Sequence, residues 1–120
     1  MVAVVGCGGN GSAEKPPERL SPDEQATLES AQQAVHRYCR KVGLYILRRG
    51  GPPTEADLEQ VDARLQALVQ VGREKPSALS PSQRTIRESI GDLVEDVEGS
   101  NCSGPVQERL NTAIAELPRP

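Results

Sequence analysis

The sequence predicts an all-α protein, a small antiparallel four-helix bundle that follows a disordered N-terminal tether. Apolar residues recur three and four positions apart in four segments between residues 21 and 118, which is the spacing of one buried helix face. Short segments rich in Pro and Gly separate these segments, and helices joined by short loops pack as antiparallel neighbours. No segment alternates apolar and polar residues for long enough to predict a strand.

The first predicted helix begins at Ser21. Pro22 occupies the first helical position and Glu24 follows the serine by three residues, which is a capping box. The Gly-Gly-Pro-Pro run at residues 50–53 ends the helix. Its predicted buried stripe consists of Leu28, Ala31, Val35, Tyr38, Val42 and Tyr45.

The second predicted helix is capped by Thr54. Glu55 and Asp57 lie in its first turn, where the helix dipole favours acids. Gly72 and Pro76 are expected to mark its end.

Ser80 is expected to open the third helix. Ser80, Pro81 and Gln83 repeat the Ser-Pro-x-Glu/Gln opening found at Ser21, and the helix is expected to end at Gly99. A shorter fourth helix begins near Pro105, so the bundle has three longer helices and a short C-terminal one.

Length and composition indicate one domain and exclude some classes of protein. The chain has 120 residues and 12.9 kDa, a formal net charge of -3 and a pI of about 5.2. An acidic chain has no general affinity for nucleic acid, so no nucleic-acid partner is expected. No apolar run is long enough to span a bilayer.

The first twelve residues, MVAVVGCGGNGS, admit two interpretations. Residues 6–11 form a literal G-x-G-x-x-G, which in a dinucleotide-binding fold lies between a strand and a helix. Pro16 and Pro17 lie where that helix should continue, and an interior proline breaks a helix. With no second parallel strand downstream, no dinucleotide cofactor is expected.

The second interpretation rests on Val4, Val5, Gly6 and Cys7, which resemble the lipobox of bacterial lipoproteins. The resemblance covers about ten residues. In that family the cysteine thiol receives a diacylglycerol and the signal sequence is cleaved just before it. Carried over to this chain, the resemblance implies lipidation at Cys7 and attachment to the cell membrane on its extracytoplasmic side.

The lipoprotein interpretation divides the chain into three parts. Residues 1–6 are the remnant of a signal sequence, residues 7–20 a flexible tether and residues 21–118 the helical bundle. Only six residues precede Cys7 and none is basic, whereas a signal needs a basic region and a longer apolar core. Met1 is therefore expected to lie within a longer signal sequence. The alternative is that Met1 is the true start of a cytosolic protein. The DNA sequence upstream of Met1 distinguishes these two possibilities.

The cysteine count agrees with an extracytoplasmic location. The cysteines are Cys7, Cys39 and Cys102. If Cys7 is acylated, the other two form an even pair, as an oxidising compartment favours. A Cys39–Cys102 disulfide would close a loop of about 63 residues and stabilise the fold by about 4 kcal/mol. Two unpaired thiols in a cytosolic protein are the alternative.

Charges are unevenly distributed between the first and third predicted helices. The stretch from Val35 to Gly50 carries five bases and no acid, whereas the stretch from Glu88 to Gly99 carries five acids and no base. In an up-down-up-down bundle these two stretches would lie side by side and pair. The basic stretch could instead face anionic lipid headgroups.

The sequence offers no recognisable catalytic or metal site. His36 is the only histidine, and there is no CxxC or HExxH pattern. A nucleophilic pair of Cys39 and His36 would have neither a partner acid nor an oxyanion hole, and a disulfide would silence the thiol. We therefore expect no catalytic residue, no metal and no cofactor, and a non-enzymatic binding or structural module with a possible partner protein in the cell envelope. The alternative is a cytosolic helical adaptor or regulator.

Overall fold

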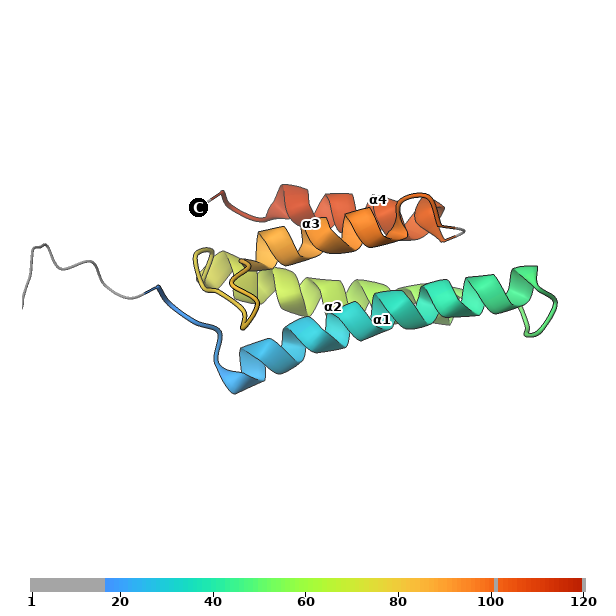
Figure 1. Cartoon of the computed structure of the whole chain (residues 1–120), viewed down its shortest axis with the longest axis horizontal. Coiled ribbons are helices and arrows are strands. Elements are labelled where there is room, and N and C mark those ends of the chain that lie inside the picture. Colours follow the sequence, from blue (N-terminus) through green and yellow to red (C-terminus); the bar gives the residue numbers. More distant parts are fainter. Residues whose placement is uncertain (1–16, 101, 120) are drawn as a thin grey trace, which may run out of the picture.

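The computed structural model describes residues 17–100 and 102–119. Within these residues the chain forms four helices: α1 (Pro22–Ile46), α2 (Glu55–Glu74), α3 (Ile86–Val97) and α4 (Ser103–Glu116). Helices α1 and α2 form one antiparallel hairpin, α3 and α4 form a second, and the two hairpins pack together (Figure 1). The predicted all-α bundle is confirmed, although α3, with 12 residues, is shorter than α4, with 14.

Helices α1 and α2 begin after Ser21 and Thr54, as the sequence predicts, and each start is a capping box. The Ser21 hydroxyl accepts a hydrogen bond from the Glu24 backbone N–H at 3.2 Å, and the Glu24 carboxylate accepts one from the Ser21 N–H at 2.8 Å. Thr54 and Asp57 repeat the arrangement at the start of α2. Each box satisfies backbone donors that the first turn of a helix leaves without a partner.

The predicted start of the third helix at Ser80 is wrong. Residues 80–84 form a tight turn, in which Gln83 has a φ of 66° and the Ser80 N–H donates to the Arg84 carbonyl at 2.9 Å. Positive φ is incompatible with a right-handed helix. Helix α3 instead begins after Thr85, whose hydroxyl accepts from the Glu88 N–H at 3.1 Å.

Gly72 lies inside α2 and does not end it, contrary to the prediction, because α2 continues to Glu74. A Cβ atom at Gly72 would lie 2.5 Å from Leu117 Cδ2 and 3.1 Å from Ile86 Cγ2. The glycine therefore lets the start of α3 and the end of α4 approach α2 closely.

The core is aliphatic and lies between the two hairpins. Tyr38 is buried as the periodicity predicts, whereas Tyr45, the last member of the predicted stripe, is 49% exposed. The stripe fails there because α3 and α4 do not reach that part of α1 (Figure 1). The largest fully buried side chains are Leu68, Ile86, Ile90, Leu110, Val35, Val61 and Val106.

The segment just before α1 pairs with the loop between α2 and α3. The Leu20 N–H donates to the Leu79 carbonyl at 3.0 Å, and the Leu79 N–H donates to the Glu18 carbonyl at 2.8 Å. Leu20 also packs against the core. The last residues of the predicted tether are therefore attached to the bundle.

Candidate functional site

The structure contains a disulfide between Cys39 and Cys102. Cys39 lies half-buried in the second half of α1, and Cys102 is the buried residue immediately before α4. Their Cα atoms are 5.1 Å apart, within the range a disulfide spans without backbone movement. The bond joins the first hairpin to the second at the level where α4 begins.

The order of the helices explains how the two cysteines meet. Helix α3 lies beside α1 as well as beside α4, so the chain leaving α3 arrives next to the second half of α1. Ser100 in this connection donates its hydroxyl to the Val97 carbonyl at 2.6 Å, and its oxygen lies 3.1 Å from Cys102 Sγ. The up-down-up-down arrangement thus places Cys102 against Cys39.

His36 and Cys39 do not form a nucleophilic pair in this structure. The sulfur of Cys39 is bonded to that of Cys102, so it carries no thiol proton for a base to remove. The side chain of His36 is 59% exposed, and its Nε2 lies 3.9 Å from a carboxylate oxygen of Asp96. Cys7, the predicted lipidation site, lies outside the described residues.

The C-terminal end of α1 is the second feature with functional potential. Four consecutive apolar residues are exposed there: Leu44 by 38%, Tyr45 by 49%, Ile46 by 52% and Leu47 by 67%. From Cys39 to Ile46 the helix rises by about 10 Å. This end of α1 and the loop after it extend past α3 and α4 (Figure 1), and we call residues 44–49 the tip.

The tip ends with a left-handed residue that is not glycine. Arg48 has a φ of 58°. Its N–H donates to the Tyr45 carbonyl at 2.9 Å, and the Arg49 N–H donates to the Leu44 carbonyl at 2.8 Å. This is the hydrogen bonding of a Schellman motif, in which glycine usually occupies the left-handed position. The bonds hold two arginines directly after the apolar run.

The predicted pairing of the basic stretch of α1 with the acidic stretch of α3 is largely absent. Among the described residues only His36 and Asp96 connect the two stretches. Asp92, another acid of the α3 stretch, pairs instead with Arg84, which lies just before α3. The nitrogen–oxygen distances of this pair are 2.8 and 3.1 Å. The bases near the tip lie beyond the end of α3, which explains why the pairing fails.

Lys41 has its partner on α2. Its Nζ donates to Asp57 Oδ2 at 2.7 Å, and the same oxygen accepts from the Thr54 N–H at 2.7 Å. The hydrogen bond from Lys41 and that from the Thr54 backbone lower the pKa of Asp57 from 3.8 to about 2. The carboxylate therefore stays charged through the physiological range and fixes the start of α2 against α1.

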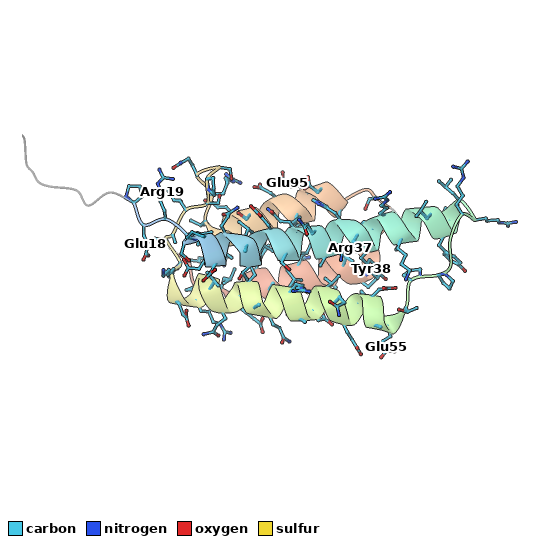
Figure 2. The ribbon with its side chains drawn as sticks, turned by 90° about the horizontal axis from the view of Figure 1, so that it is seen from below. Glu18, Arg19, Arg37, Tyr38, Glu55 and Glu95 are labelled. Carbon is cyan, nitrogen blue, oxygen red and sulfur yellow. A yellow bond between two sulfur atoms is a disulfide. The ribbon has the colours of Figure 1, made fainter. Side chains whose placement is uncertain are left out.

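A shallow groove of about 290 Å³ lies between α1 and α2 on the side of this ion pair. Arg37 and Tyr38 lie along it, as Figure 2 shows. Arg64 from α2 adds a further cation. The groove is open and is lined mostly by polar and charged side chains.

Neither a metal cluster nor a membrane-spanning helix is found in the described part of the chain. No group of three or more His, Cys, Asp or Glu side chains there could hold a metal ion. None of the four helices is long and apolar enough to cross a membrane.

The fold and the two sites define an all-helical, disulfide-bonded four-helix bundle with an apolar, basic tip. No protein family, curated protein or solved structure matches this chain.

Proposed function

We propose that this chain is the extracytoplasmic domain of a bacterial lipoprotein, held at the membrane by a diacylglycerol on Cys7. The domain works as a non-enzymatic binding or structural module in the cell envelope. The observation that carries the proposal is the Cys39–Cys102 disulfide.

The disulfide supports the proposed location because structural disulfides persist in oxidising compartments and are rare in a reducing cytosol. It connects two hairpins whose core contains no Phe and no Trp. A domain of about 100 residues gains limited net stability from burial alone, so a covalent link between its halves is physically useful. The bond uses two of the three cysteines and leaves Cys7, which follows the lipobox-like residues 4–6.

The position of the tip supports a binding role. Isolated exposed apolar residues are normal on a protein surface, whereas a contiguous group of them marks an interaction site. Helix α1 begins next to the N-terminal segment and carries the tip at its opposite end, about 37 Å away along the helix. A domain attached through its N-terminus thus presents the tip at a distance from its attachment point.

The proposal is tested by fractionating bacteria that express the gene from its native locus. We expect the wild-type protein in the membrane fraction, partitioning into detergent on phase separation. Cys7→Ser should move the protein into the soluble fraction once the membranes are washed with concentrated salt, which screens electrostatic contacts with headgroups and leaves a lipid anchor in place. The matched control is Cys39→Ser with Cys102→Ser, which should alter stability and leave the surviving folded protein at the membrane. Equal distribution of wild type and Cys7→Ser between the fractions would overturn the proposal.

A further inference from the structure

The tip combines an apolar surface with an uncompensated positive charge. Its four apolar side chains are followed at once by Arg48 and Arg49, both exposed. Arg40, also exposed, lies one helical turn before Leu44. Exposed apolar side chains beside basic ones favour the interface of a lipid bilayer, where the former bury apolar surface and the latter meet anionic headgroups.

The arrangement of the apolar residues favours a lipid surface over a protein partner. Successive residues of an α-helix point about 100° apart, so residues 44–47 cover the whole circumference of the helix end. A protein partner with a flat face would cover only one side of such a surface and would leave the rest in water. Lipid surrounds an inserted helix end on every side and buries all four side chains.

Charge complementarity identifies the kind of lipid. From Val35 to Gly50 the chain carries five bases and no acid. Lys41 is the only one of the five that forms an ion pair in the described structure, with Asp57. Glu55, the nearest acid after the loop, projects from the side of α2 that faces away from α1 (Figure 2). The tip is therefore positively charged and complements anionic headgroups.

We propose that the tip inserts into the headgroup region of an anionic bilayer. Ile46 and Leu47 enter the boundary of the acyl chains, and Tyr45 places its ring among the headgroups, where tyrosine is favoured. Arg48 and Arg49 bind lipid phosphates. The contact does not depend on acylation at Cys7, and it makes α1 a second point of membrane attachment.

The tip can reach the same membrane as a lipid on Cys7. Glu18 is hydrogen-bonded to the bundle, so the linker that can extend runs over the eleven positions from Cys7 to Glu18, and each extended residue spans at most about 3.3–3.6 Å. Its maximum reach of about 36–40 Å matches the length of about 37 Å over which α1 separates its two ends.

Vesicle binding by the full chain carrying Cys7→Ser tests the proposal without a contribution from the anchor. The chain contains no Trp, so Tyr45→Trp provides a single fluorescent reporter at the tip. We expect its emission to shift to shorter wavelength with vesicles of equimolar phosphatidylglycerol and phosphatidylcholine. Vesicles of phosphatidylcholine alone should give a much smaller shift.

Binding measured by vesicle sedimentation should depend on both parts of the tip. Ile46→Ser with Leu47→Ser should weaken binding at least tenfold, because less apolar surface is buried. Arg48→Gln and Arg49→Gln should each weaken it about fivefold. The matched controls are Arg64→Gln and Arg119→Gln, each of which removes one positive charge from an exposed position away from the tip and should change binding less than twofold.

Three outcomes would overturn the proposal. The first is no binding to anionic vesicles, and the second is binding that the tip variants leave unchanged. The third is self-association of the chain that depends on Ile46 and Leu47 without vesicle binding, which would assign the tip to a second copy. The tip variants and their controls lie at exposed positions, and their helical circular dichroism should equal that of the parent. A failure of Cys7 acylation would leave these measurements unaffected.

Discussion

Cys102 is bonded to Cys39 across the bundle; the two residues are 63 positions apart in the sequence, and their Cα atoms are 5.1 Å apart. The bond lies where α4 begins, and α1 continues beyond it with only α2 as a neighbouring helix. The same bond therefore ties the two hairpins together and marks the point from which the tip projects.

Removal of the disulfide should destabilise the fold strongly. The bond closes a loop of 63 positions. Because the unfolded chain regains conformational freedom when this loop is opened, Cys39→Ala with Cys102→Ala should lower the free energy of unfolding by about 4 kcal/mol. Urea unfolding followed by circular dichroism measures the change. Cys7→Ser is the control and should leave the transition in place. Equal midpoints for the parent and the double variant would contradict this role of the bond.

Arg48→Gly should stabilise the domain and weaken its binding to vesicles. The φ of 58° places a non-glycine residue in the left-handed region, at a cost of about 1 kcal/mol that glycine does not incur. We expect the free energy of unfolding to rise by about that amount. Arg49→Gly, the adjacent position without a positive φ, should give no gain. A loss of stability in Arg48→Gly would contradict the assignment of strain to this residue.

Alanine should have opposite effects at two helical glycines. Gly91 has no atom within 4 Å of the position that a Cβ would occupy, so Gly91→Ala should raise the free energy of unfolding by about 1 kcal/mol. At Gly72 the added methyl group would meet Leu117 and Ile86. This overpacking should lower the free energy of unfolding by about 1 kcal/mol. Thermal unfolding of the two variants measures the difference. Equal stabilisation by both substitutions would show that the contact at Gly72 is loose.

Asp57 should stabilise the fold at neutral pH and lose this effect in acid. Its pKa is about 2 in the folded state against an ordinary value of 3.8, so the unfolded chain takes up this proton first as the pH falls. The stabilisation is complete above about pH 4 and is lost between about pH 4 and pH 2. The carboxyl chemical shift followed by NMR gives the pKa directly.

Lys41→Gln should move the pKa of Asp57 back toward its ordinary value, since the hydrogen bond from Lys41 is the main cause of the shift. Arg37→Gln, one turn earlier on α1, is the control and should leave the titration in place. A titration of Asp57 that is insensitive to Lys41→Gln would contradict the ion pair.

Most of the fold could be predicted from the sequence because its signals are local. Helix spacing and the capping boxes at Ser21 and Thr54 depend on residues within one turn of each other. The signal at Ser80 matches that of Ser21, but the Ser80 N–H donates to the Arg84 carbonyl and closes a turn instead of opening a helix. The adjacent Leu79 pairs with Glu18 and Leu20, which are distant in the sequence, and no local pattern reveals that pairing.

The tip could not be predicted, because its exposure depends on where other helices end. Tyr45 continues the apolar period of Leu28 and Tyr38, and it is exposed because neither α3 nor α4 reaches that part of α1 (Figure 1). The left-handed conformation of Arg48 has no sequence signal, since glycines follow at positions 50 and 51 and suggest a later end to the helix. The pairing of Cys39 with Cys102, in contrast, could be anticipated from the cysteine count and the order of the helices.

The lipid on Cys7 and the Cys39–Cys102 bond are tested together by the intact mass of the protein, purified from membranes and treated with an alkylating agent without reduction. We predict a chain beginning at Cys7 that carries one diacylglycerol and no alkyl group. Its mass should be lower than that of the reduced chain by two hydrogens, which are lost in the Cys39–Cys102 bond. A chain alkylated at all three cysteines would contradict both the lipid anchor and the disulfide-bonded architecture.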